Sequence, residues 1–177
     1  MSKVHEHPPV KLVVGFISAK EKCFISAEKA LIKKFGMIDF QSKVIAFNLT
    51  DYYESEFGKN LKRKFISFGR LIPEGGLSRI KIFTNGLEKK FSKNKKRRIN
   101  IDPGYLTCAK LVLATTKDFN HRIFLNSGIL AEVTLTYKKN GFCPFEWTYP
   151  DYRTKEYREI FKKIRVIYRR QLEEKEL

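Results

Sequence analysis

The sequence predicts an α+β domain with a ferredoxin-like βαββαβ core, extended by a C-terminal β-hairpin and a long terminal helix. Short β-branched runs alternate with two segments whose apolar residues recur at helical spacing, and turn-forming residues separate them. A content of 42% hydrophobic and 31% charged residues is typical of a globular protein. The 177 residues suit a single domain, 1–177, in which residues 1–9 are expected to form a mobile tail.

The first half of the chain supplies the first three strands and the first helix of this core. Residues 11–18 form an apolar, β-branched run that predicts a strand. Ser26 is placed to cap a helix that Gly36 ends. A second strand is predicted over 44–49 and a third over 64–72.

The next segment supplies the second helix and the fourth strand. Pro73 opens the helix, and its apolar residues have helical spacing. They are Leu77, Ile80, Phe83, Leu87 and Phe91. The fourth strand is predicted over 98–101, where the turn Asp102-Pro103-Gly104 ends it. The order of these elements is β-α-β-β-α-β.

The second half of the chain extends the core. Residues 106–118 favour a short buried helix, and a strand over 111–115 is the alternative. A hairpin is predicted between 123–125 and 129–137, around Asn126-Ser127-Gly128.

A last turn and a last helix follow. Lys139-Asn140-Gly141 is a further turn signal, and Thr154 is placed to cap the helix. The apolar stripe of this helix is Tyr157, Phe161, Ile164, Tyr168 and Leu172.

The cysteines and the apolar runs bear on the compartment. Cys23, Cys108 and Cys143 are far apart and form no C-x-x-C pair, which indicates free thiols in a reducing compartment. The longest apolar runs are far shorter than the ~20 residues that span a bilayer. We therefore expect a cytoplasmic protein that needs no metal and no cofactor.

The net charge of +17 is concentrated in one part of the chain. The stretch from Lys59 to Arg98 holds fourteen Lys and Arg against two Glu, a net charge of +12. Such a stretch could neutralise nucleic-acid phosphates, and a solvated surface is the alternative. The candidate nucleic-acid contacts are Lys89, Lys90, Lys93, Lys95, Lys96, Arg97 and Arg98.

The predicted topology would gather polar residues at one edge of the sheet. If the second and fourth strands end where the first and third begin, Asp51 and Asp102 lie at the same edge, about 14 Å apart. Lys62 and Arg63 would enter the third strand there, and Tyr105 would leave the fourth. Asp51 and Asp102 are then candidate catalytic residues. The alternative is that they only end a strand and set a turn.

His121 is the second candidate catalytic group. It follows Lys117 and precedes Arg122, and these three side chains could do acid–base chemistry or hold a phosphate. A hydrogen-bonded structural histidine is the alternative. Lys117, Arg122, Lys62, Arg63, Tyr105 and Thr107 are the candidate ligand or phosphate contacts.

Two further features have a functional and a structural interpretation. Trp147, Tyr149 and Tyr152 could stack a base or pack beneath the last helix. That helix carries basic residues around its apolar stripe, for contact with RNA, with a second copy or with solvent. They are Arg158, Lys162, Lys163, Arg165, Arg169 and Arg170.

Several blocks of the sequence resemble the prokaryotic domain-of-unknown-function family 4416. They are Thr50-Asp51-Tyr52-Tyr53, Leu61-Lys62-Arg63-Lys64-Phe65, Asn100-Ile101-Asp102-Pro103-Gly104-Tyr105-Leu106-Thr107, Lys110-Leu111-Val112-Leu113-Ala114-Thr115-Thr116-Lys117-Asp118 with His121-Arg122, and Trp147-Thr148-Tyr149-Pro150-Asp151-Tyr152. The resemblance covers nearly the whole chain and implies a stand-alone domain but no activity. The sequence departs from the family pattern at Cys108, where similar sequences often have Pro.

Some members of that family carry an automatic GTP-binding label, which the residues here do not support. A P-loop needs G-x-x-x-x-G-K-[ST], and the sequence has no such segment. A guanine-reading Thr-Lys-x-Asp would need Asp at position 119, which is Phe119.

The sequence thus favours a protein that binds an anionic ligand, RNA or a nucleotide, through a basic surface. One alternative is a small enzyme that acts on a phosphorylated metabolite, with Asp102 or His121 as the acid–base group. Another is a non-enzymatic assembly or accessory protein, which is favoured if an exposed apolar patch pairs the last helix with a second copy in a homodimer.

Overall fold

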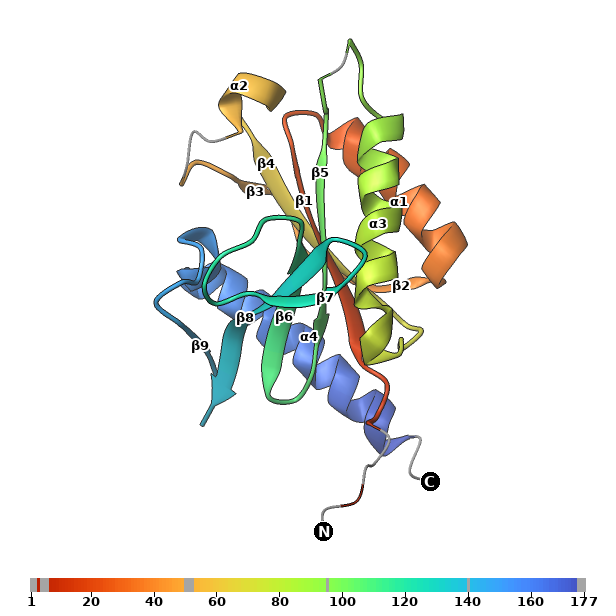
Figure 1. Ribbon diagram of the computed structural model, residues 1–177, viewed down its shortest axis with the longest axis vertical. Coiled ribbons are helices and arrows are strands. Elements are labelled where there is room, and N and C mark those ends of the chain that lie inside the picture. The colour runs from red at the N-terminus through yellow and green to blue at the C-terminus, as the bar shows by residue number, and fades with distance from the viewer. Residues whose placement is uncertain (1–2, 4–6, 50–52, 95, 140, 175–177) are drawn as a thin grey trace.

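The computed structural model describes residues 3, 7–49, 53–94, 96–139 and 141–174 (Figure 1). The elements are β1 (Lys11–Ser18), α1 (Glu21–Phe35), β2 (Ile38–Gln41), β3 (Ile45–Ala46), α2 (Glu54–Phe57), β4 (Lys62–Phe68), a 3₁₀ turn (Glu74–Gly76), α3 (Leu77–Lys90), β5 (Asn100–Leu106), β6 (Lys110–Thr115), β7 (Ile123–Asn126), β8 (Ile129–Lys138), β9 (Gly141–Pro144), a second 3₁₀ turn (Asp151–Arg153) and α4 (Lys155–Glu173). The expected mixture of helices and a sheet is confirmed. The predicted tail, 1–9, lies largely outside the described residues.

The nine strands form one antiparallel sheet in the order β2-β4-β1-β5-β6-β8-β7, with β3 beside β4 and β9 beside β8. Because β1 runs antiparallel to both β4 and β5, those two strands run in the same direction. Both begin at the edge where β1 ends. The sequence predicts that the fourth strand ends at the edge where the third begins. This prediction is wrong, because the fourth strand corresponds to β5, which begins at that edge.

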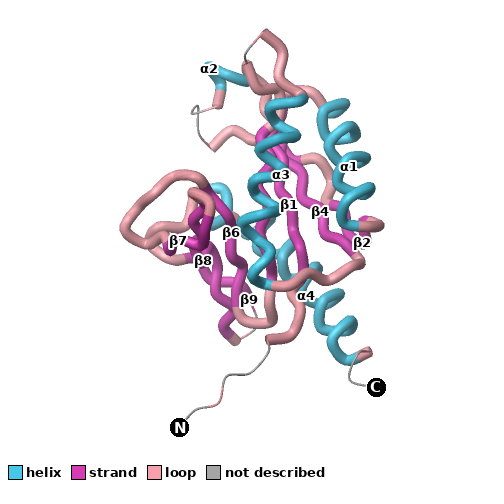
Figure 2. Tube along the Cα trace, turned by 45° about the vertical axis from the view of Figure 1, so that its right-hand side comes forward, coloured by secondary structure: helices cyan, strands magenta, loops and turns pink. Residues whose placement is uncertain are grey.

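Helices cover both faces of the sheet (Figures 1 and 2). All eight residues of β1 are buried, because α1 and α3 pack on one face and α4 on the other. Side chains at alternate positions of β1 join different cores: Val14 lies with α1 and α3, and Val13 with α4. The pairing of β1 with β4 and with β5 therefore lies between two layers of helices. No helix in the described ranges is long and apolar enough to cross a membrane.

The sequence locates the start of α4 and the end of α1 correctly, but not the start of α1. α1 begins at Glu21, five residues before the predicted cap. Ser26 lies inside the helix, where its hydroxyl donates to the carbonyl of Lys22 (3.0 Å). Gly36 ends α1 as predicted, with a φ of 91°. Thr154 caps α4 as predicted by accepting the N–H of Tyr157 (3.3 Å).

The strands of the first half differ from the prediction in their bounds. The strand expected over 44–49 is reduced to the two residues of β3, and β2 lies earlier in the chain. β5 runs straight through the predicted turn to Leu106. Pro103 fits there because its nitrogen faces the side of β5 where β6 is not paired, so no ladder hydrogen bond is lost.

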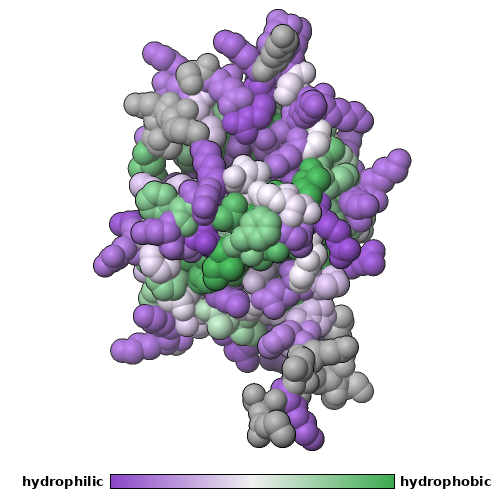
Figure 3. Space-filling view, in the orientation of Figure 1, coloured by the Kyte–Doolittle hydropathy of each residue, from purple (hydrophilic) through white to green (hydrophobic). Residues whose placement is uncertain are grey.

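The second half contains strands where a helix was favoured. Residues 110–115 form β6, so the alternative for this segment is confirmed and the helix is wrong. The hairpin of β7 and β8 is confirmed, with Ser127 and Gly128 at positive φ. Asn140 of the next turn lies outside the described residues. Apolar side chains gather at the middle of the face shown in Figure 3, over the region of β7.

Gly104 should be essential for the contact between β5 and β6. A Cβ atom there would overlap the carbonyl oxygen of Val112 and lie 2.7 Å from a methyl carbon of Leu113. We expect Gly104→Ala to lower the free energy of unfolding by about 2–3 kcal/mol in urea denaturation.

Gly86→Ala is the matched control, since no atom lies within 4 Å of the added Cβ on α3. This substitution should raise stability by about 0.5–1 kcal/mol. Equal effects of the two substitutions would contradict a steric role for Gly104.

Candidate functional site

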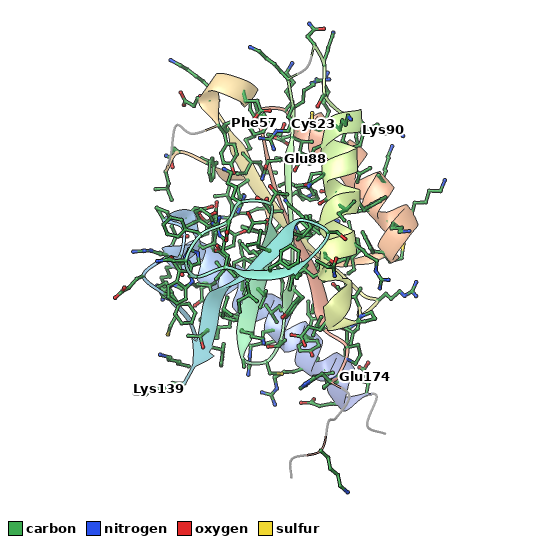
Figure 4. All side chains as sticks on the ribbon, viewed as in Figure 1. Cys23, Phe57, Glu88, Lys90, Lys139 and Glu174 are labelled. Atoms are coloured by element: carbon green, nitrogen blue, oxygen red, sulfur yellow. The ribbon has the colours of Figure 1, made fainter. Side chains whose placement is uncertain are left out.

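A cavity of about 590 Å³ opens where β6 separates from β5. Its walls come from the end of β1, the start of β4, the first half of β5, α3, the end of β6 and the loop before α4. We name it the fork cavity. Its polar lining includes Arg63, Lys81, Asn85, Glu88, Arg97, Asn100, Asp102, Lys117, Glu132, Tyr149, Asp151 and Tyr152. Glu88 points from α3 toward β5, whereas Lys90 points away (Figure 4).

The cavity exists because β5 loses its partner strand halfway along its length. β5 pairs with β1 over all seven residues but with β6 only from Gly104 to Leu106. α3 binds the exposed backbone in place of β6. The N–H of Ile101 donates to Glu88 Oε1 (2.6 Å), and Lys81 Nζ donates to the carbonyl of Ile101 (3.2 Å). The N–H and the carbonyl of Ile101 thus have hydrogen-bond partners although no strand lies beside them, and the space of the cavity stays open.

Arg63 forms the floor of the fork cavity and is 1% exposed. Its Nη2 donates to the hydroxyl of Tyr152 (2.7 Å) and lies 3.4 Å from Asp151 Oδ2, and its Nη1 lies 3.7 Å from Asp102 Oδ2. Four aromatic rings surround the guanidinium at 4.8–5.8 Å. Burial alone would lower its pKa, but Tyr152 and the carboxylates outweigh that effect, and the pKa of Arg63 stays above its ordinary value.

Asp102 is the carboxylate of the cavity that solvent reaches best. Its side chain is 25% exposed, against 10% or less for Glu88, Glu132 and Asp151. Asn100 Nδ2 donates to Asp102 Oδ2 (2.5 Å), and Lys81 Nζ lies 3.4 Å from Asp102 Oδ1. These contacts fix the carboxylate in one orientation and leave part of it open to a ligand.

Two other carboxyls of the cavity are deeply buried. Burial raises the pKa of Asp151, and the charge of Arg63 opposes that change only in part. Burial likewise raises the pKa of Glu88, although Lys81 and Arg97 lie close to it. Asp151 and Glu88 therefore belong to the wall of the cavity and expose little surface to a ligand.

Arg122 holds the mouth of the cavity together. Its guanidinium donates to Glu132 on β8 (2.9 Å), to the carbonyl of Lys117 (2.9 Å) and to the hydroxyl of Tyr149 (2.6 Å). Lys117 and Tyr149 line the cavity, whereas the side chain of Arg122 is 8% exposed and lies behind them. Arg122 therefore positions two mouth residues instead of facing a ligand.

His121 also lies behind the cavity wall. Its Nε2 is 3.1 Å from Glu132 Oε2, and its ring stacks on Trp147 at 5.2 Å. It is outside the set of residues that line the cavity. These contacts are those expected of a hydrogen-bonded structural histidine, the alternative that the sequence left open.

The remaining predicted ligand contacts lie elsewhere. Lys62 pairs with Glu21 (2.5 Å), and the hydroxyl of Tyr105 donates to Glu74 (2.5 Å). The hydroxyl of Thr107 accepts N–H groups within the turn between β5 and β6. Asp51 lies outside the described residues.

The predicted nucleic-acid contacts divide into two groups. Lys89, Lys90, Lys93 and Lys96 are exposed at the end of α3 and in the following loop. Arg97 turns inward instead, with a bidentate pair to Glu56 (2.6 and 2.7 Å) and a contact to Glu88 (3.0 Å). Arg98 is half-buried, and Lys95 lies outside the described residues.

The aromatic loop before α4 packs as well as lining the cavity. Tyr152 is buried and stacks on Phe161 of α4 at 5.7 Å. Trp147 stacks on Phe145 and donates to the carbonyl of Val133 (3.0 Å). Tyr149 is half-exposed at the mouth of the cavity.

Sequence reasoning missed most of the polar wall. Lys81, Asn85 and Glu88 recur at helical spacing beside the apolar stripe of α3, and that polar stripe was the available signal. Glu132 and Asp151 gave no comparable pattern, because their partners come from distant segments. In the part of the chain that the structure describes, no three His, Cys, Asp or Glu side chains are grouped to hold a metal ion.

Glu88 should make stability depend on pH. Its pKa is raised by burial, so the folded chain holds this proton more tightly than the unfolded chain. The free energy of unfolding should therefore fall as the pH rises from about 4.5 through the raised pKa. Glu88→Gln should make this fall shallower in urea denaturation across the same pH range.

Glu159→Gln is the control, because Glu159 is exposed on α4. It should leave the pH profile of stability as in the wild type. A Glu88→Gln profile as steep as that of the wild type would show that Glu88 does not cause the slope.

Comparison with known proteins identifies a family for this chain. Neither the curated proteins nor the solved structures contain a match. A family model described as Domain of unknown function (DUF4416) matches residues 8–168 of the 177. The chain belongs to this DUF4416 family.

Proposed function

We propose that this protein binds a small anionic molecule of about nucleotide size in the fork cavity. The observation that carries the proposal is a concave site of about 590 Å³ that holds the accessible Asp102 carboxylate and the exposed Lys117. Sites for small molecules usually measure ~300–1,000 Å³ and combine an apolar lining with a few oriented polar groups.

The charges at the cavity surface indicate the chemistry of the ligand. Asp102 accepts hydrogen bonds, so it suits a hydroxyl or amino group of a ligand. Lys117 lies at the mouth beside Thr115 and Thr116 and suits an anionic group. A phosphorylated metabolite or a nucleotide carries both kinds of group.

The geometry favours a small molecule over an RNA strand. Proteins that bind single-stranded RNA on a sheet use an open face with exposed aromatic residues. Here α1 and α3 cover one face and α4 the other. The exposed Lys89, Lys90, Lys93 and Lys96 remain the basis of the RNA alternative.

An enzyme that acts on such a ligand is the second candidate. Its support is the placement of Asp102, which lies 3.4 Å from Lys81 and within reach of a bound molecule. A carboxylate in this position could take a proton from a substrate hydroxyl. His121 would then position the wall through Glu132.

We also propose a fold relationship and a compartment. The order β2-β4-β1-β5, with α1 and α3 on one face, supports a ferredoxin-like unit to which β6–β9 and α4 are added. The three cysteines are free thiols, which supports a cytoplasmic location.

Binding of nucleoside monophosphates tests the proposed function. Isothermal titration calorimetry with the four ribonucleoside monophosphates should show binding, and the matching nucleosides should bind more weakly. Asp102→Asn and Lys117→Ala should each weaken binding about tenfold, because each removes a charge-assisted hydrogen bond.

Lys93→Ala is the matched control, since Lys93 is an exposed lysine outside the cavity lining. It should leave the affinity unchanged. Loss of binding in Lys93→Ala, with full binding in Asp102→Asn and Lys117→Ala, would move the ligand to the basic surface and contradict the proposal.

A further inference from the structure

β7 is the last strand in the sheet order, and its backbone is paired on one side only. It bonds to β8 through Ile123, Phe124 and Asn126. No strand in the described ranges pairs with its other side. An open edge of this kind can accept another strand through its free N–H and C=O groups.

The side chains of this edge are apolar and exposed. Ile123 is 70% exposed, Phe124 63% and Leu125 39%, and Phe119 in the preceding loop is 62% exposed. An aromatic side chain has about 150–250 Å² of surface, so these four together expose roughly 400 Å². Apolar side chains are concentrated in this region of the surface (Figure 3). Soluble monomers normally protect such an edge with lysine or proline, and β7 has neither.

Charge does not oppose association at this edge. β7 has no charged residue, and the nearby His121 and Arg122 both contact the carboxylate of Glu132. The exposed lysines of the basic stretch lie at the end of α3, away from β7 (Figures 1 and 4). The exposed lysines Lys89, Lys90, Lys93 and Lys96 would therefore add little repulsion to a second copy bound at β7.

α4 offers a poorer surface for a second copy. Its exposed large apolar side chain is Val166, and the rest of its stripe is buried or half-buried against the sheet. The dimer face expected on this helix therefore has less support than β7.

We propose that two copies of this chain associate through β7, paired antiparallel about a two-fold axis. Residues directly opposite in an antiparallel pair point to the same face, so pairing about a two-fold axis centred on Phe124 places Phe124 opposite Phe124 of the second copy and Ile123 opposite Leu125. The sheet then continues from one protomer into the other. The apolar area is about half of the ~800 Å² per partner in a standard interface, so the dimer is expected to dissociate on dilution.

Sedimentation velocity of the full chain over a concentration series tests this dimer. The wild-type mass should rise with concentration from 20.8 kDa toward twice that value. Phe124→Lys places a charge in the proposed interface and should abolish the rise. Ile123→Lys should do the same.

Ile82→Lys is the matched control, because Ile82 is an exposed apolar residue on α3. It should dimerise like the wild type, and circular dichroism should show equal thermal stability for all variants. A wild type that stays monomeric throughout would overturn the proposal and leave β7 for another partner. Dimerisation of Phe124→Lys, or its loss in Ile82→Lys, would also overturn it.

Discussion

A buried guanidinium needs partners for its charge, and Arg63 finds them in two other parts of the chain. It belongs to β4, and it contacts Asp102 on β5 and the pair Asp151 and Tyr152 before α4. These contacts set how the end of the sheet, the last helix and the cavity floor lie together. Loss of one partner from such a buried group typically costs about 3–5 kcal/mol, because an unmatched charge remains.

The fork cavity forms beside Arg63, at the point where β6 separates from β5. Gly104 brings β5 and β6 into close contact, and the first half of β5 pairs with β1 but not with β6. Lys81 and Glu88 of α3 bind its backbone at Ile101. Asp102 therefore lies beside an open space, with its carboxylate oriented by Asn100, Lys81 and Arg63. If β6 paired with β5 along its whole length, it would fill the space that the cavity occupies.

The sequence predicted best the features that depend on local patterns. The apolar stripe and Thr154 cap of α4, and the turn between β7 and β8, follow from spacing and turn chemistry alone. Ser26 and Asp102-Pro103-Gly104 misled the prediction, since tertiary contacts overrode their usual roles. A serine can bond back within a helix, and proline and glycine suit a strand whose partner ends early.

The candidate site was predictable only in part, because most of it is assembled from distant segments. Arg63 and Asp102 were expected at one edge, and they do meet, but through a strand direction opposite to the expected one. Glu132 and Asp151 could not be assigned, because their partners lie far away in sequence. His121 is conspicuous in the sequence as the histidine outside the N-terminal segment, yet its contacts to Glu132 and Trp147 place it behind the cavity wall.

The most direct test of the fork cavity as a ligand site is a crystal structure of the protein purified without added ligand, with mass spectrometry of any molecule it releases. The account predicts density for a small anionic molecule between Asp102 and Lys117, with Arg63 still bound to Asp151 and Tyr152. An anion bound instead to the exposed lysines at the end of α3, beside an empty cavity, would contradict it. So would a closed cavity in which Arg63 no longer contacts Asp102.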